Sequence, residues 1–337
     1  MSQSVDLQGL MKRIATNKAP YTDAELQLLS DAEARDVRAI MPLWNEIPEN
    51  KKRDFLDELY NKYENDTRVN YENFAVALLD DPSDLVKILG LLLLGENNQS
   101  KVADLVLRLA KNSKDEDVQV GAISRLGLYI ELFVNQDMAW PASKDVFDYL
   151  LATTQDPNNR IAQAALKSLA TFDDPLLEDL IGRAFAHNEA SWQEAGIYAA
   201  GKVSDTQWLG NILNALQHPD IDVRLAAVSV CGNNMISASR QPLIEMLEDE
   251  ENDEIFHNII WSLSCIGGED VRTVIEAIMA ETEEEMEIEM LEEALENLSL
   301  TEEMEQFDIF KFDADDEDLI ELDEEIQEPA KSKTKRK

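Results

Sequence analysis

The apolar positions of the chain follow a helical period in windows that recur every thirty-odd residues. Seven windows begin with an apolar residue: Val86, Val118, Ile161, Trp192, Val223, Ile255 and Met286. Positions 0, 4, 5 and 8 of each window lie on one face of a helix, because these spacings match about 3.6 residues per turn. Position 5 always carries a large apolar residue: Leu91, Ile123, Leu166, Ile197, Val228, Ile260 and Leu291. We expect this face to form the core.

Each window is preceded by a turn and by another amphipathic segment, so the repeated unit is a pair of helices. The turns carry Asp, Asn or Pro, which cap or stop helices. Position 4 is small in the first five windows and would let a neighbouring helix approach closely. Position 9 is Gly in four windows, which we interpret as a helix end. One step between windows is 43 residues long, and its residues 129–141 predict an extended helix or an insertion.

A pair of short helices cannot bury its apolar face alone, whereas stacked pairs can. The pattern therefore predicts an all-α protein, built as a right-handed α-solenoid of stacked helix pairs. We expect three parts: a helical N-terminal cap (1–48), a repeat array (49–299) and an acidic disordered tail with a basic end (300–337). Thr22–Glu25 in the cap is predicted to be a capping box. The tail has too few apolar residues to offset the entropy of ordering.

Residues 220–232 have the sequence DIDVRLAAVSVCG, which resembles the second helix of HEAT repeats, of the short kind related to bilin-lyase repeats. Residues 117–127 and 158–170 are weaker copies. The resemblance covers roughly residues 50–300, and the layout with a helical cap and an acidic tail is similar to bacterial HEAT-repeat proteins. It implies an armadillo-like superhelix that acts as a protein-interaction scaffold.

The charge of the chain limits its partners. The sequence contains 69 acidic and 30 basic side chains, for a net charge of -39. Like charges would repel nucleic acid and an anionic membrane surface, so neither is expected as a partner. Two cysteines cannot form a disulfide framework and favour a reducing compartment. No signal peptide or membrane-length apolar run is present, so we expect a cytoplasmic protein. The oligomeric state stays open.

Motifs that carry chemistry are absent from the sequence. There is no Gly-rich phosphate loop, no nucleophile elbow and no Cys–His pairing. HEAT-type deoxyhypusine hydroxylases hold iron with repeated His-Glu pairs, whereas here His187, His218 and His257 are followed by Asn or Pro. We therefore predict no enzyme activity, no catalytic residue, no cofactor and no metal site. Chromophore handling of the bilin-lyase kind stays an alternative, since it needs an apolar groove more than a motif.

Positions 2 and 6 of a window point away from the predicted core. There Tyr198, Leu225, His257 and Trp261 are more apolar or aromatic than a solvated surface requires. We predict that they form a protein-binding site on the concave face, for a partner with a basic or mixed surface. One alternative is that Tyr198 and Trp261 pack under neighbouring loops or the tail. Another is an acidic chaperone or nucleic-acid mimic, in which the tail binds basic proteins.

The remaining residues of note are given structural roles. Trp192, Trp208, Cys231 and Cys265 are predicted to lie in the core. Arg160 and Arg224 follow turn Asp residues and predict an Asp–Arg ladder along the repeats. The acidic run at residues 248–251 is interpreted as a solvated loop, with contact to a cation or a basic peptide as the alternative.

Overall fold

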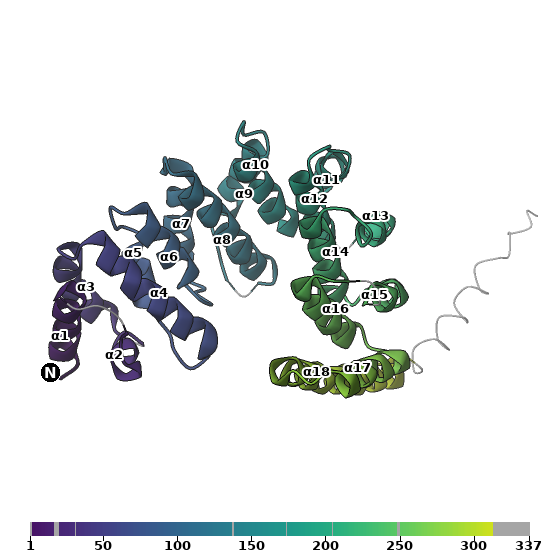
Figure 1. Ribbon diagram of the computed structural model, residues 1–337. Helices are drawn as coiled ribbons and strands as arrows, with labels where there is room; N and C mark the ends of the chain where they lie inside the picture. Colours follow the sequence, from purple (N-terminus) through teal and green to yellow (C-terminus); the bar gives the residue numbers. More distant parts are fainter. Residues whose placement is uncertain are drawn as a thin grey trace, which may run out of the picture. The chain divides into compact units, whose positions relative to one another are not determined.

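The computed structural model describes residues 2–16, 20–30, 32–136, 138–172, 174–203, 205–247 and 250–312. These residues form 18 α-helices and three short 3-10 helices, and no β-strand occurs among them. The all-α class and the stacked helix pairs predicted from the sequence are confirmed (Figure 1). The chain divides into two compact units, Met1–Val203 and Ser204–Lys337.

The first unit starts with four helices that precede the repeated windows: α1 (Ser2–Thr16), α2 (Asp23–Gln27), α3 (Ala34–Asn45) and α4 (Glu49–Asn65). Four pairs follow: α5 (Glu72–Leu78) with α6 (Asp84–Leu92), α7 (Ser100–Asn112) with α8 (Glu116–Val134), α9 (Ser143–Thr153) with α10 (Asn159–Leu169), and α11 (Leu177–Phe185) with α12 (Ala190–Val203). The 3-10 helix η1 (Ala170–Phe172) follows α10. The second helices of the pairs pack against one another in chain order.

The second unit contains three more pairs: α13 (Leu209–Ala215) with α14 (Ile221–Asn233), α15 (Arg240–Leu247) with α16 (Asp253–Ile266), and α17 (Glu269–Glu281) with α18 (Glu285–Phe312). The 3-10 helices η2 (Thr206–Trp208) and η3 (Ser237–Ser239) lead into α13 and α15. Helix α14 packs on α16, and α16 packs on α18.

The core lies on the predicted face of the second helices. All seven residues at position 5 are buried, with at most 4% of their surface exposed. Two window starts differ from the prediction. Met286 is 81% exposed in the first turn of α18, and Trp192 is half-buried in the first turn of α12.

The small residues at position 4 let the two helices of a pair approach closely, as predicted. A Cβ at Gly90 would lie 2.9 Å from the Cβ of Leu78 in α5. A Cβ at Gly196 would lie 3.1 Å from the Cβ of Ala184 in α11.

The glycines at position 9 end a helix in one window only. Gly95 follows α6 and has a φ of +55°, which glycine adopts without strain. Gly127 and Gly232 lie inside α8 and α14, so their interpretation as helix ends was wrong. Gly201 likewise lies inside α12.

A serine of the next second helix explains Gly127 and Gly232. The Oγ of Ser262 in α16 donates to the carbonyl of Val228 in α14 at 3.0 Å. A Cβ at Gly232 would lie 2.5 Å from that Oγ and 2.7 Å from the Cα of Ser262. Ser168 and Ile123 repeat the same hydrogen bond at 2.9 Å beside Gly127. The glycine therefore leaves room for the serine, and the serine bonds the two helices together.

In five of the pairs, the turn between the two helices carries two side-chain caps. Ser83 caps α6 by accepting the backbone N–H of Val86. The predicted Asp and Asn caps are confirmed: Asp115, Asn158, Asp220 and Asn252 accept backbone N–H groups from the first turn of their helices. Two residues before the cap, a second side chain accepts the backbone N–H of the cap residue itself. This acceptor was missed from the sequence, because its residue type varies: Asp81, Ser113, Asp156, His218 and Glu250.

A buried ion pair attaches the N-terminal helices to the first pair. The Nζ of Lys52 in α4 lies 2.7 Å from Asp81, which precedes α6, and both side chains are at most 4% exposed. The indole Nε1 of Trp44 in α3 donates to the same carboxylate at 2.9 Å. One carboxylate thus joins three segments of the chain.

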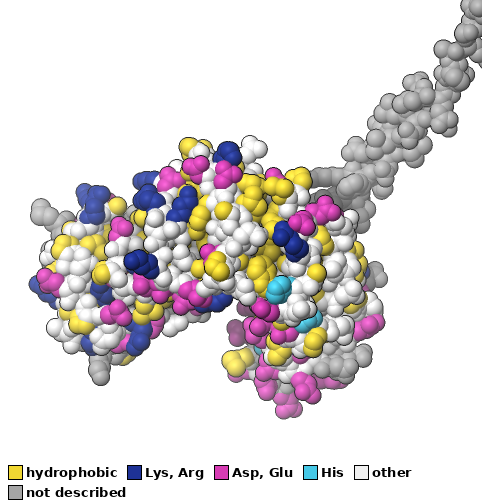
Figure 2. All heavy atoms as spheres, turned by 90° about the horizontal axis from the view of Figure 1, so that it is seen from above, with side chains coloured by type: hydrophobic (Ala, Val, Ile, Leu, Met, Phe, Trp, Pro, Cys, Tyr) yellow, Lys and Arg dark blue, Asp and Glu magenta, His cyan; other side chains and the backbone are white. Residues whose placement is uncertain are grey.

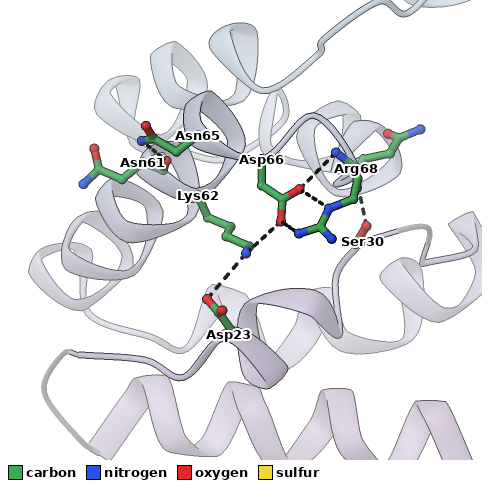
Figure 3. Close-up of polar contacts among 8 residues, drawn as sticks. Asp23, Ser30, Asn61, Lys62, Asn65, Asp66 and Arg68 are labelled. Atoms are coloured by element: carbon green, nitrogen blue, oxygen red, sulfur yellow. Dashed lines mark hydrogen bonds and ion pairs between the residues drawn. The ribbon is translucent and has the colours of Figure 1, made fainter. Parts of the chain in front are cut away.

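A second polar cluster joins α2 to the loop after α4 (Figure 3). Lys62 lies 2.9 Å from Asp66 and 3.5 Å from Asp23 of α2. Arg68 donates to Asp66 from Nε at 2.8 Å and from Nη2 at 3.0 Å. Arg68 and Lys62 hold the pKa of the Asp66 carboxyl well below its usual range. The predicted capping box is also present, since Glu25 accepts the backbone N–H of Thr22.

The irregular step between windows consists of a longer helix and a loop, as expected. Helix α8 has 19 residues, and the loop after it returns Trp140 to the interior, where its Nε1 donates to Asp104 at 2.8 Å.

Helix α18 continues to Phe312, past residue 299, where we expected the repeat array to end. Residues 313–337 of the predicted tail lie outside the described residues. The three-part division of the chain therefore stays a prediction. Among the described helices, none combines the length and the apolar character that a membrane span requires.

Candidate protein-binding face

Three of the predicted site residues lie on two neighbouring helices of the second unit. Leu225 is on α14, and His257 and Trp261 are on α16, four residues apart and therefore on one side of that helix. Trp261 is 49% exposed, His257 is exposed and Leu225 is half-buried. Ile221, 46% exposed and four residues before Leu225, extends the row on α14. We call Ile221, Leu225, His257 and Trp261 the second-helix face.

The local sequence determines where this face lies. Asp220 and Asn252 cap α14 and α16 and so set the residue at which each helix begins. The window positions on α16 are all buried: Ile255, Ile259, Ile260 and Leu263. Trp261 follows directly after two of these core residues, so its indole emerges on the other side of the helix. The hydrogen bond from Ser262 to Val228 holds α14 and α16 side by side.

Tyr198, the fourth predicted residue, belongs to the first unit, on α12. Its ring is half-buried, and the ammonium of Lys167 lies 4.7 Å from the ring centroid. The same ammonium lies 2.7 Å from the carboxylate of Glu194. Tyr198 is thus covered by a side chain of α10. The protein-binding role of the four residues stays a prediction.

A cavity of about 740 Å³ opens at the N-terminal ends of α14 and α16. We call it the α14–α16 cavity. Its lining comes from α13 to α16 and the turns between them, and consists of Leu216, Gln217, His218, Ile221, Arg224, Glu245, Met246, Glu250, Glu251 and Asn252. Ile221 belongs both to this cavity and to the second-helix face, so the two are continuous. The sequence offered one signal for the cavity, the acidic run at residues 248–251.

The charges of the cavity are only partly compensated. Arg224 lies 3.5 Å from the carboxylate of Glu250, whose side chain is 8% exposed. Arg224 also donates to the carbonyl of His218 at 3.0 Å. Glu250 is therefore a buried ion-pair partner, which corrects its interpretation as part of a solvated loop. Glu245 and Glu251 are exposed, and no ion pair with another described residue involves them. The lining keeps an excess of negative charge.

The acidic character extends over the second unit. Residues 205–303 contain 24 Asp and Glu, three Arg and no Lys. On the side that Figure 2 shows, Lys and Arg are spread over the first unit, whereas Asp and Glu gather on the second. A segment with this charge attracts cationic groups and repels anionic ones.

The predicted arginine ladder is present in part. Arg160 lies 2.8 Å from Asp117 and also pairs with Glu116, one repeat earlier. Arg224 pairs with a glutamate, Glu250, instead of an aspartate. Both arginines therefore have structural partners.

The four cysteines and tryptophans that the sequence assigned to the core differ in their burial. Cys231 is buried, and burial raises the pKa of its thiol to about 11. Cys265, Trp192 and Trp208 are half-buried, so their assignment to the core was wrong. Trp192 lines a small cavity of about 230 Å³ beside His187. Within the described part of the chain, no group of three His, Cys, Asp or Glu side chains is placed to hold a metal ion.

Comparison with known proteins identifies the repeats. Residues 206–296 match the family model of HEAT repeats. Among solved structures, YibA from Escherichia coli is 14% identical with a TM-score of 0.40, and the alignment covers 89% of this chain and 97% of YibA. Human deoxyhypusine hydroxylase in complex with glycerol is 14% identical with a TM-score of 0.34, covering 88% of this chain and 97% of the hydroxylase. No curated protein matches the sequence.

One of these comparisons corrects the prediction that the chain is not an enzyme. Human deoxyhypusine hydroxylase is an enzyme by its name, although its similarity to this chain is low. A fold by itself neither establishes nor excludes catalysis.

The helix pairs, the buried window positions and the family match agree over the second unit. The prediction of HEAT repeats is confirmed, and residues 206–296 of this chain carry HEAT repeats.

Proposed function

We propose that the chain is a protein-interaction scaffold, which binds a protein partner through the second-helix face of its second unit. The observation that carries this proposal is the exposure of Trp261, 49% of whose surface meets solvent on a helix with a fully buried opposite side. Ile221 and Leu225 add apolar surface on the neighbouring helix. Exposed aromatic residues beside apolar neighbours are typical anchors of protein interfaces.

The charge of the second unit supports a partner with a basic or mixed surface. Complementary charge speeds the encounter of two proteins and disfavours partners of like charge. A HEAT-repeat array is compatible with this role, because its stacked second helices present a continuous surface.

The test is recovery of partners from the native organism by affinity purification with quantitative mass spectrometry. We expect Trp261→Ala and the double variant Leu225→Ala/Trp261→Ala to lower recovery of a specific partner at least about tenfold, the typical effect of losing an interface anchor. Met286→Ala is the matched control, since Met286 is 81% exposed on α18 outside the face. Unchanged recovery by a folded double variant, judged by circular dichroism, would refute the proposal.

Removal of residues 313–337 tests the chaperone or mimic alternative. Our proposal predicts that binding survives this deletion, which leaves every described residue in place. Loss of binding would assign it to the tail.

A further inference from the structure

We propose that the occupant of the second-helix face is a basic amphipathic segment of a partner protein. Its apolar side chains contact Ile221, Leu225 and Trp261, and a Lys or Arg side chain enters the α14–α16 cavity. This inference rests on the proposed function and names the chemistry of the partner.

Two carboxylates of the cavity have no cationic partner among residues 205–303. Glu245 and Glu251 line the cavity without an ion pair to any described residue, while Arg224 is engaged by Glu250. Residues 205–303 contain no Lys, and the other two Arg, Arg240 and Arg272, do not line the cavity. Glu245 accepts a neutral hydrogen bond from Gln241 at 2.9 Å, so its charge and that of Glu251 remain uncompensated at a cavity of about 740 Å³ and are available to an incoming cation.

Arg272, another of the three arginines in residues 205–303, is already paired within the second unit. It lies 2.7 Å from Glu302 and also donates to Ser299, both on α18. Because Arg272 and Arg224 are already paired, they do not compensate the excess carboxylates of residues 205–303. An ammonium or guanidinium group forms charge-assisted hydrogen bonds with carboxylates, which are stronger than neutral ones.

The cavity borders the apolar row of α14 at Ile221. This indicates that the cation belongs to a side chain of a polypeptide. Ile221 borders the cavity and lies one helical turn from Leu225, on the helix that packs beside Trp261. A free metal ion would make no use of these apolar residues, and no described cluster is placed to hold one. An anionic ligand is repelled by the unit. A segment with apolar residues on one side and basic residues beside them matches both features.

The test uses the full-length chain and two synthetic helical peptides as probes. Both peptides carry the same leucines, with Lys and Arg at the polar positions of one and Glu at those of the other. Binding is measured by fluorescence anisotropy of the labelled peptide. We expect the basic peptide to bind and the acidic peptide not to bind at the same concentrations.

Two double variants separate the cavity from the general charge of the unit. Glu245→Gln/Glu251→Gln is expected to weaken binding of the basic peptide about 5- to 30-fold, in line with the loss of two partly exposed charge-assisted contacts. Glu276→Gln/Glu281→Gln removes the same charge from exposed positions of α17 that do not line the cavity, and is expected to change the affinity less than about twofold, since salt screens exposed charges that make no direct contact.

Three outcomes would overturn the inference. Equal weakening by the two double variants would show a diffuse charge effect. Equal binding of both peptides would remove the basic specificity. Loss of binding in a chain without residues 313–337 would place the peptide on the tail.

The same measurements distinguish this inference from the proposed function. If Trp261→Ala abolishes partner recovery but Glu245→Gln/Glu251→Gln leaves peptide binding unchanged, the second-helix face binds the partner and no basic side chain enters the α14–α16 cavity. If only Glu245→Gln/Glu251→Gln weakens binding of the basic peptide, the α14–α16 cavity binds the basic side chain and the proposed role of Trp261 is refuted.

Discussion

Single glycines and serines control how closely the second helices pack. Gly232 of α14 lies against Ser262 of α16, and in the first unit Gly127 of α8 lies against Ser168 of α10 in the same way. Interiors are packed at the density of crystals, so one added methyl group at such a contact displaces its neighbours.

Gly232→Ala should therefore destabilise the second unit. The added Cβ would meet the Oγ and the Cα of Ser262 at 2.5 and 2.7 Å, so we expect a loss of about 1–3 kcal/mol of unfolding free energy, measured by urea denaturation. Gly210→Ala is the control in α13, since a Cβ there meets no atom within 4 Å. It should leave stability unchanged or raise it by up to about 1 kcal/mol. Similar losses in both variants would contradict the role of Gly232.

The two cysteines should react at different rates. Burial raises the pKa of the Cys231 thiol to about 11, so almost none of the reactive thiolate exists at pH 8 in the folded chain. Cys265 is half-buried. We expect Ellman's reagent to label Cys265 first, and to label Cys231 only as fast as the unit opens. In the Cys265→Ser variant, labelling should become slow in buffer and rapid in urea, and rapid labelling in buffer would refute the buried position of Cys231.

At the scale of elements, capped turns join the two helices of a pair, and the buried ion pair of Lys52 with Asp81 attaches α4 to the turn before α6. The caps themselves could be predicted, because Asp, Asn and Ser before an apolar period mark a helix start. The acceptors two residues earlier could not be predicted, since His218, Asp156 and Glu250 share a geometric role and no common chemistry in the sequence.

Lys52→Met should destabilise the first unit strongly. It leaves the Asp81 carboxylate fully buried without its cation, which costs about 3–5 kcal/mol in comparable pairs, measured here by urea denaturation. The double variant Lys52→Met/Asp81→Asn removes both charges and should recover much of this loss. Lys87→Met is the control, because its partner Asp84 is exposed and such pairs contribute about 0–1 kcal/mol. Equal effects of Lys52→Met and Lys87→Met would contradict the buried pair.

At the scale of the molecule, the dominant feature is the unequal distribution of charge. Residues 1–203 contain 33 acidic and 21 basic side chains, whereas residues 205–303 contain 24 and three. The repulsion among these carboxylates acts against the compact state of the second unit.

Salt should therefore stabilise the protein. The Debye length falls from about 30 Å at 0.01 M to about 10 Å at 0.1 M ionic strength, which screens repulsion between exposed carboxylates. We expect the Tm to rise by about 2–4 °C over this range, equivalent to about 1 kcal/mol. The variant Glu283→Gln/Glu284→Gln/Glu285→Gln removes three adjacent exposed charges and should show a smaller salt response. A fall in Tm with salt would mean that attractive ion pairs outweigh the repulsion.

The sequence by itself determined the repeat, the all-α class and the core. Burial of Leu91, Val228 and their equivalents follows from a period of about 3.6 residues, which is a local property that amino-acid order records directly. The N-caps follow from the same register, which also places Trp261 away from the core, whereas its exposure to solvent was left open by the sequence. These features depend on residues close together in the chain.

The tertiary structure alone decided which distant residues share a contact. The serine beside Gly232, the pairing of Lys52 with Asp81 and the α14–α16 cavity each join segments some thirty residues apart. A glycine at a helix end and a glycine at a close helix contact look the same in a sequence. Only the distance to the neighbouring helix separates them, and that distance is set by the packing of whole helices.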